Sequence, residues 1–143
     1  ITLTRTGELW HDGEQIVRKS LRDALLSWVD THPHDGRFIL QNGYDWGYLV
    51  VEDTPFFVAD VIREPDGVSL RLAGGRQTPL DPGSLVVDEE GVLFAEAPGH
   101  QARCLRTAQL AIAPLLGVGP GAEPVLELAG RVFLIGPRTA ARQ

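Results

Sequence analysis

The fold is decided by two stretches of sequence, Gly7–Leu26 (GELWHDGEQIVRKSLRDALL) and Gly91–Leu110 (GVLFAEAPGHQARCLRTAQL), which align without a gap. At a constant offset of 84 residues, six of the 20 pairs are identical, whereas chance gives roughly one or two in a composition rich in Leu, Ala and Gly. The identical pairs are Gly7/Gly91, Leu9/Leu93, Leu21/Leu105, Arg22/Arg106, Ala24/Ala108 and Leu26/Leu110. The sequence therefore predicts internal repeats at about residues 1–52 and 85–136.

The first repeat predicts a short hairpin, a helix and two strands. Apolar residues at positions i, i+3, i+4 and i+7 indicate an amphipathic helix over about Arg18–Val29. A cluster of helix-breaking residues at 32–36 ends this helix. Apolar runs at Phe38–Leu40 and Tyr48–Val51 then indicate strands on either side of an Asn-Gly turn.

The second repeat copies this order, with a hairpin, a helix over about Ala102–Leu116 and strands at Pro124–Leu128 and Arg131–Ile135. The loop before these strands is two residues longer than in the first repeat, and the connection between them is two residues shorter. We therefore expect Phe133–Ile135 to correspond to Leu49–Val51, which returns the offset to 84.

Between the repeats, residues 53–84 contain a Pro-Asp-Gly turn followed by alternating Val68, Leu70 and Leu72, the pattern of a β-hairpin. No low-complexity linker separates the two halves. We expect one compact α+β unit over residues 1–143, made of two related ββαββ-like repeats with antiparallel sheets, two main helices and this connecting hairpin.

The composition argues against several classes of protein. The 143-residue chain has a net charge of −6, whereas general nucleic-acid binding and docking on an anionic membrane both rest on basic surfaces. No apolar segment approaches the length of a transmembrane helix. A single cysteine, Cys104, excludes an internal disulfide, so the simplest compartment is a reducing cytoplasm.

The histidines and the cysteine give little support to catalysis or metal binding. His32 and His34 lie in a Pro-Gly loop without a third ligand nearby, so a solvated loop is favoured over a metal site. His11 and His100 precede the two helices, where each could cap, bind an anion or be exposed. Cys104 is either a thiol with a lowered pKa at a helix N-terminus or a small buried residue. We therefore assign no catalytic residue, metal or cofactor.

Polar and aromatic residues gather at equivalent positions of both repeats, which predicts a binding site where the repeats meet. Tyr44 and Trp46 lie in a predicted loop and could stack on a ligand. Basic residues near both helix starts oppose the helix macrodipole, so they bind either an anion or a carboxylate partner such as Glu52 or Asp53. The candidate ligand-binding residues are Trp10, His11, Arg18, Tyr44, Trp46, Glu52, Asp53, His100 and Arg103.

Three motifs resemble one known family. Gly7-x-Leu-Trp-His-Asp-Gly, Val51-Glu-Asp-Thr-Pro-Phe and Gly130-Arg-Val-Phe-Leu-Ile-Gly are similar to segments of the bacterial domain-of-unknown-function family numbered 1285. The resemblance covers nearly the whole chain and implies an α+β fold of two related repeats. It implies no established activity, cofactor or catalytic residue, and it suggests a role in signalling.

The function that we expect is a non-enzymatic, cytoplasmic binding module for a small molecule or a protein segment, with no nucleic-acid or membrane partner. One alternative is a homo-oligomeric assembly protein, for which exposed Tyr44 and Trp46 would serve as interface anchors. A second alternative is a hydrolase with His11 or His100 as general base.

Overall fold

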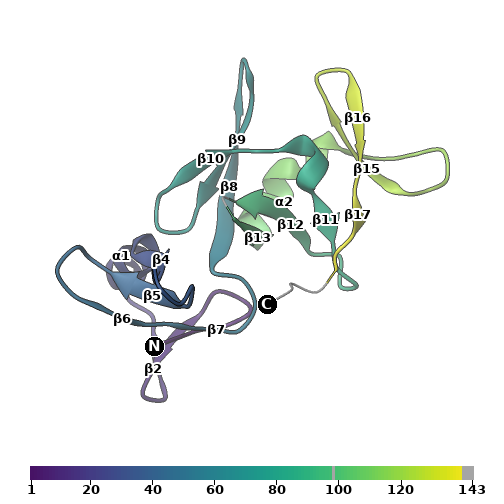
Figure 1. Ribbon diagram of the computed structural model, residues 1–143. Coiled ribbons are helices and arrows are strands. Elements are labelled where there is room, and N and C mark those ends of the chain that lie inside the picture. Colours follow the sequence, from purple (N-terminus) through teal and green to yellow (C-terminus); the bar gives the residue numbers. More distant parts are fainter. Residues whose placement is uncertain (98, 140–143) are drawn as a thin grey trace. The chain divides into compact units, whose positions relative to one another are not determined.

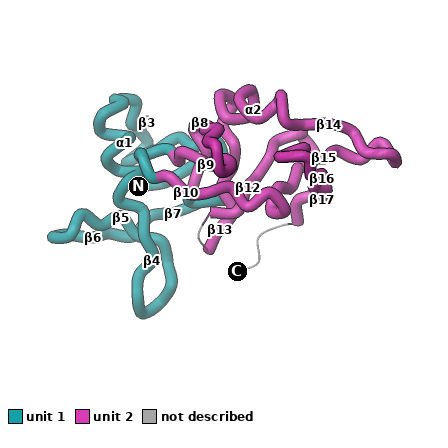
Figure 2. The backbone as a smooth tube through the Cα atoms, turned by 90° about the horizontal axis from the view of Figure 1, so that it is seen from above, with its two compact units in different colours: residues 1–55, 73–76 teal, residues 56–72, 77–143 magenta. Residues whose placement is uncertain are grey.

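The computed structural model describes residues 1–97 and 99–139 and confirms a mixed α+β fold with two α-helices and several antiparallel sheets (Figure 1). The chain forms two compact units (Figure 2). Unit 1 holds residues 1–55 and 73–76, and unit 2 holds residues 56–72 and the chain from residue 77 onward. Within the described ranges, neither helix has both the length and the apolar character needed to cross a membrane.

Unit 1 is built from two sheets and helix α1 (Lys19–Ser27). Its strands are β1 (Thr2–Leu3), β2 (Leu9–His11), β3 (Glu14–Ile16), β4 (Val29–Thr31), β5 (Phe38–Gln41), β6 (Trp46–Tyr48) and β7 (Val50–Val51). One sheet has the order β3-β2-β1-β7 and the other the order β4-β5-β6. Alternation along the strands and the apolar stripe of α1 bury side chains such as Leu3, Leu9 and Leu25.

Unit 2 contains helix α2 (Arg106–Ile112) and the short 3-10 helices η1 (Pro82–Ser84) and η2 (Ala113–Leu115). Its strands are β8 (Phe56–Glu64), β9 (Gly67–Leu72), β10 (Gln77–Pro79), β11 (Val86–Val87), β12 (Leu93–Ala97), β13 (His100–Cys104), β14 (Leu116–Val118), β15 (Pro124–Leu128), β16 (Arg131–Leu134) and β17 (Gly136–Pro137). The larger sheet has the order β10-β9-β8-β13-β12-β11-β17, and the smaller one is β14-β15-β16. The core includes Leu70, Leu85, Ile112 and Leu126.

The two repeats have the same order of elements and the same strand pairings. Strands β1 and β11 each pair antiparallel with the next strand and parallel with the last strand of their repeat. Thr2 pairs with Trp10, and Val86 pairs with Phe94, each position lying 84 residues further on. The β8-β9 hairpin comes between the repeats in the chain, as the Pro-Asp-Gly turn predicts.

The helices correspond at an offset of 87 residues, because α1 begins at residue 19 and α2 at residue 106. The backbone N–H of Arg22 donates to the Arg18 carbonyl, and that of Gln109 donates to the Leu105 carbonyl, so the first turns agree. The four identical pairs in the helix region, which align at an offset of 84, therefore lie three residues out of register with the structural correspondence of the helices. Such a shift rotates a position by only about 60°, so two apolar stripes still match when they are out of register.

The second helix is shorter than the sequence predicts, because the two ends of the expected segment form strands. Residues 100–104 are strand β13, which pairs with β12 and β8 and buries Ala102 and Cys104 on one face. Pro114 lies in η2, since proline cannot continue the hydrogen bonding of an α-helix, and β14 follows from Leu116. The first helix also ends earlier than expected, at Ser27.

The last strands of the repeats correspond at an offset of 86 and not 84. The Leu49 N–H donates to the Phe38 carbonyl, and the Ile135 N–H donates to the Pro124 carbonyl. Leu49–Val51 therefore corresponds to Ile135–Pro137, which corrects the expected match to Phe133–Ile135. The two hairpin turns have the same length, because Asn42 is hydrogen bonded to Asp45 as Leu128 pairs with Arg131, which again gives an offset of 86.

Residues 73–76 belong to unit 1, although the segments on both sides of them belong to unit 2. Gly74 has a φ of +98°, and a Cβ at this position would lie 2.8 Å from the backbone nitrogen of Ser27. The Arg76 guanidinium donates to the carbonyl oxygens of Ser27 and Val29, at 3.2 and 3.0 Å. This segment therefore caps the C-terminal end of α1.

Candidate functional site

Three aromatic residues at every second position form an exposed row, here called the aromatic stripe: Tyr44, Trp46 and Tyr48, with exposed fractions of 94%, 53% and 40%. Within β6, Trp46 and Tyr48 share a face, and the next residue, Leu49, points the other way and is buried, whereas Tyr44 lies in the turn that precedes the strand. The Asn42 side chain accepts the backbone N–H groups of Tyr44 and Asp45, both at 2.9 Å, which fixes the turn before β6. Trp46 thus lies in a strand, although the sequence predicts a loop there.

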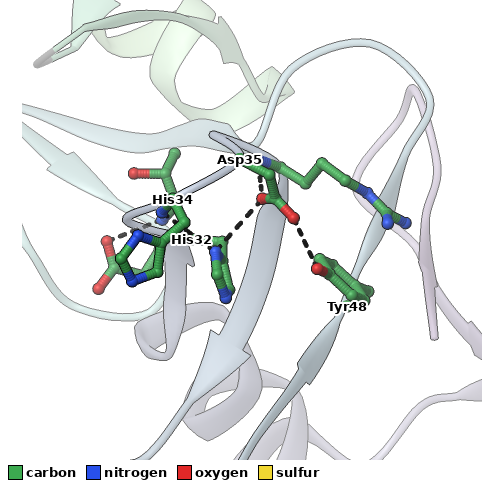
Figure 3. A network of polar contacts seen from close by, with 7 residues as sticks. His32, His34, Asp35 and Tyr48 are labelled. Atoms are coloured by element: carbon green, nitrogen blue, oxygen red, sulfur yellow. Dashed lines mark hydrogen bonds and ion pairs between the residues drawn. The ribbon is translucent and has the colours of Figure 1, made fainter.

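Tyr48 is held by the loop between β4 and β5 (Figure 3). Its hydroxyl donates to Asp35 Oδ2 at 2.6 Å, and Asp35 Oδ1 accepts the backbone N–H of Arg37 at 2.9 Å. The Arg37 guanidinium lies 3.7 Å from the centre of the Tyr48 ring, a cation–π contact. These contacts fix the ring of Tyr48 from its edge and from one face.

His32 packs against the aromatic stripe. Its ring centre lies 4.8 Å from that of Trp46, and the Trp46 and Tyr48 rings meet edge to face at 5.2 Å. His32 Nδ1 accepts the backbone N–H of His34 at 3.2 Å and lies 3.5 Å from Asp35 Oδ1. The Trp46 and Tyr48 rings therefore have a preformed arrangement.

Two carboxylates beside the stripe are kept ionised. The hydrogen bond from the Tyr48 hydroxyl, followed by that from the Arg37 N–H, lowers the pKa of Asp35 below its usual value. The same hydrogen bond raises the pKa of Tyr48, so the phenol keeps its proton. The Gln41 amide, 2.8 Å from Asp30 Oδ2, is the main cause of a lowered pKa at Asp30.

Strand β6 is the last strand of its sheet, and nothing in the described ranges pairs with its outer edge. Leu49 is hydrogen bonded to Phe38, so the alternation of antiparallel pairs makes Gly47 the next bonded residue. The N–H and C=O groups of Trp46 and Tyr48 therefore point away from β5. This free edge lies beside the aromatic stripe.

Seven of the nine predicted site residues belong to unit 1, and two belong to unit 2. Tyr44 lies in the turn before β6, and Trp46 is the first residue of that strand. Trp10 donates from Nε1 to Glu8 Oε1 at 3.1 Å, and His11 is an exposed residue whose Nε2 lies 3.6 Å from Asp12. Arg18 is the residue before α1 and makes no side-chain capping bond.

Glu52 and Asp53 follow β7, and Glu52 Oε1 accepts the backbone N–H of Arg5 at 2.9 Å. His100 and Arg103 lie in β13 of unit 2. Burial lowers the pKa of His100, and Nη1 of Arg103 is buried without a hydrogen-bond partner in the part of the chain that is described. The predicted site at the junction of the repeats stays a prediction.

Cys104 also lies in β13, and not at a helix N-terminus as the sequence suggests. Burial raises the pKa of its thiol to about 12, so Cys104 is a buried core residue and not an activated nucleophile. Among the residues that the structure describes, no three His, Cys, Asp or Glu side chains are grouped to hold a metal ion.

Sequence reasoning missed His32, Asp35, Arg37 and Tyr48 as site residues. The alternation of Trp46 and Tyr48 is a visible signal for one exposed strand face, with Tyr44 in the turn before it. By contrast, the contact between Asp35 and Tyr48 joins residues 13 positions apart and depends on the β5-β6 register, which composition does not reveal.

The fold defines a class of α+β proteins that is represented by crystal structures. One is a DUF1285 family protein from Silicibacter pomeroyi, with 18% identity and a TM-score of 0.68 over 95% of this chain and 79% of that chain. Another is a DUF1285 family protein from Shewanella baltica, with 15% identity and a TM-score of 0.56 over 73% of this chain and 83% of that chain. No family model and no curated protein matches the chain. The resemblance to family 1285 is thus confirmed at the level of the fold.

Proposed function

We propose that this chain is a non-enzymatic binding module that recognises a protein segment through the aromatic stripe and the free edge of β6. The observation that carries the proposal is the exposed row of Tyr44, Trp46 and Tyr48, in which Trp46 and Tyr48 are held in place by contacts with His32, Asp35 and Arg37. Trp and Tyr are the residues most often found as energetic anchors of interfaces, because they bring a large apolar area together with a polar atom.

The fixed arrangement of the stripe favours binding. Tyr48 is held by Asp35 and Arg37, and Trp46 packs against His32 and Tyr48. Side chains that are ordered before binding lose less conformational entropy when the partner arrives. The outward N–H and C=O groups of Trp46 and Tyr48 can in addition pair with an extended segment that adds as a fourth strand beside β6.

The charges beside the stripe favour a basic segment. Asp30 and Asp35 have lowered pKa values and stay ionised at neutral pH. The positive charge of Arg37 faces the Tyr48 ring, and the whole chain carries a net charge of −6. We therefore expect the bound segment to carry Lys or Arg together with apolar residues. We further propose that this module acts in signalling, in a reducing cytoplasm.

A binding function is preferred to the hydrolase alternative because of the surroundings of His11 and Cys104. A general base needs a nucleophile or water positioned within reach. His11 is exposed beside Asp12, and burial of Cys104 removes the one thiol from consideration as a nucleophile.

The test is to pan a library of random 12-residue peptides on the wild-type protein after depletion on the Trp46→Ala variant. We expect enriched peptides with Lys or Arg and apolar residues, binding the wild type at least tenfold more tightly than Trp46→Ala. The matched control is Val132→Ala, which changes the corresponding exposed position of the second repeat and should leave the affinity unchanged. Circular dichroism checks that both variants are folded. Equal affinity for wild type and Trp46→Ala would contradict the proposal.

A second candidate, self-association, is favoured by one observation: a free edge strand beside exposed aromatics can also pair with a second copy of the chain. Sedimentation velocity over a hundredfold range of concentration tests it. A dimer that is lost in Trp46→Ala would support this candidate, and a monomer at all concentrations would exclude it.

A further inference from the structure

Unit 2 contains a groove that no pattern in the sequence predicts. This groove is separate from the aromatic stripe and from the predicted site at the junction of the repeats. Its volume is about 540 Å³, which falls in the usual range of small-molecule sites. One wall comes from the turn of the β8-β9 hairpin and from the segment around β10 and η1, and the other wall from η2, β15 and β16. In Figure 1 the β8-β9 and β15-β16 hairpins rise from the same side of this unit.

The interior of the groove is apolar, with Val68, Leu80, Leu115, Leu128 and Phe133 among its lining residues. Several of them belong to the core of unit 2 or pack against it, so these walls are fixed by the fold. A rigid apolar wall favours an aliphatic chain or a ring, because each buried CH₂ group contributes through the area that it removes from water.

The polar lining consists of Arg63, Glu64, Asp66 and Arg131. Arg63 and Arg131 come from different strands, and within the described ranges neither has an ion pair with a carboxylate. The Glu64 carboxylate, by contrast, accepts the hydroxyl of Ser69. The Arg131 guanidinium lies 5.3 Å from the centre of its neighbouring Phe133 ring, at the junction of charged and apolar lining.

We infer that this groove binds an amphipathic monocarboxylate, with its apolar part against Leu115, Leu128 and Phe133 and its carboxylate at Arg63 and Arg131. A guanidinium offers two parallel N–H donors, a geometry that matches a carboxylate. Glu64 and Asp66 balance the two arginines, so the lining as a whole is not strongly positive. That balance favours a single negative charge and disfavours a dianion such as a phosphate ester.

The experiment is isothermal titration of the full chain with octanoate, octanol and octyl phosphate as probes. Octanoate should bind in a one-to-one ratio, and octanol, which has the same chain without the charge, should bind at least tenfold more weakly. Octyl phosphate should also bind more weakly than octanoate. Amide chemical shifts should change at residues 63–68 and 128–133. Octanol binding as tight as octanoate, octyl phosphate binding more tightly, or shifts confined to unit 1, would overturn the inference.

The arginines are tested with Arg63→Gln and Arg131→Gln, which keep a polar side chain of similar reach and remove the charge. Each should weaken octanoate binding about tenfold or more, because a hydrogen bond to an ionised group is lost. The matched control is Arg71→Gln, since Arg71 pairs with Asp60 at 3.2 Å and does not line the groove. Unchanged binding in both groove variants, or an equal loss in the Arg71→Gln control, would contradict the assignment.

Discussion

The β4-β5-β6 sheet of the first repeat and the β14-β15-β16 sheet of the second have the same strand pairing but different outward faces. Ile39 pairs with Tyr48 as Val125 pairs with Leu134. The corresponding positions on this face are Asp30/Gly117, Ile39/Val125, Gln41/Glu127, Trp46/Val132 and Tyr48/Leu134, of which Ile39 and Val125 are buried. The first repeat therefore presents aromatic rings with polar groups around them, and the second presents the aliphatic side chains of Val132 and Leu134, which are 63% and 61% exposed.

The difference separates what the fold requires from what it permits. The inward positions Leu40 and Leu126 carry the same residue and are buried in both sheets. The outward positions vary from Trp46 to Val132 without a change in pairing, so the fold does not need the aromatic stripe. This contrast is the reason for placing the binding function on the first repeat.

The largest expected effect comes from the shared inward positions. Leu40→Ala and Leu126→Ala should each lower the free energy of unfolding by about 2–5 kcal/mol, because both changes leave a cavity among buried side chains. Urea denaturation measures the change. The outward control, Leu134→Ala, should cost less than about 1 kcal/mol. A larger loss for the outward variant than for Leu126→Ala would break the assignment of the two faces.

The next effect tests how the helices correspond. Arg22 donates to the Gly7 carbonyl at 3.1 Å, and Gln109 donates to the corresponding Gly91 carbonyl at 3.0 Å while accepting the Leu93 N–H. Arg22→Ala and Gln109→Ala should each cost about 1 kcal/mol or somewhat more.

The control for this pair is Arg106→Ala, because Arg106 is matched to Arg22 by sequence identity but is exposed. This variant should change the free energy of unfolding by less than about 0.5 kcal/mol. If Arg106→Ala cost as much as Gln109→Ala, the offset of 87 would lose its physical support.

A third expectation compares the stability of the two units. The tryptophans at positions 10, 28 and 46 all lie in unit 1, and the lone cysteine, Cys104, lies in unit 2. We expect tryptophan fluorescence to change at a lower urea concentration than labelling of Cys104, since unit 2 has the larger sheet and a large buried cluster. In the native state the thiol should react slowly, because it is buried and its pKa is raised to about 12. Labelling that precedes the fluorescence change would contradict this order.

The smallest effect is on the pKa of Asp35. It concerns the first repeat only, since the position that corresponds to Tyr48 in the second repeat is Leu134. Because the pKa of Asp35 is lowered in the folded state, its contribution to stability is present above the pH at which the unfolded carboxyl titrates. That contribution is lost as the pH falls through the lowered folded pKa. Tyr48→Phe removes the main cause, so the pKa of Asp35 should rise toward its usual value. Carboxyl NMR titration measures this rise, and no change would exclude the hydrogen bond in solution.

Much of the fold could be predicted because it depends on local patterns. The hairpin turns, the apolar stripe of α1 and the alternation of β9 are all visible in sequence. The offset of 84 that the sequence alignment predicts is wrong for the helices, since an apolar stripe of period 3.6 nearly matches itself after a shift of three residues. Strand β13 was missed because its small residues Ala102 and Cys104 are compatible with a helix, and their strand state depends on pairing with residues of β8 that lie 46 positions earlier in the chain.

The candidate site could be predicted only in part. Tyr44 and Trp46 were identified from their aromatic character in a turn region. The partners of Tyr48 were not, because Asp35 and Arg37 reach it across the sheet. The groove of unit 2 draws its lining from segments between residues 63 and 133, and no local pattern connects them.

The central claim is that the aromatic stripe of the first repeat binds a protein segment and that the corresponding face of the second repeat does not. The most direct measurement is the affinity of one panned 12-residue peptide for the Trp46→Ala and Val132→Ala variants, by fluorescence anisotropy. The account predicts at least a tenfold loss in Trp46→Ala, about 1.4 kcal/mol, and wild-type affinity in Val132→Ala. Wild-type affinity in Trp46→Ala, or an equal loss in both variants, would contradict it.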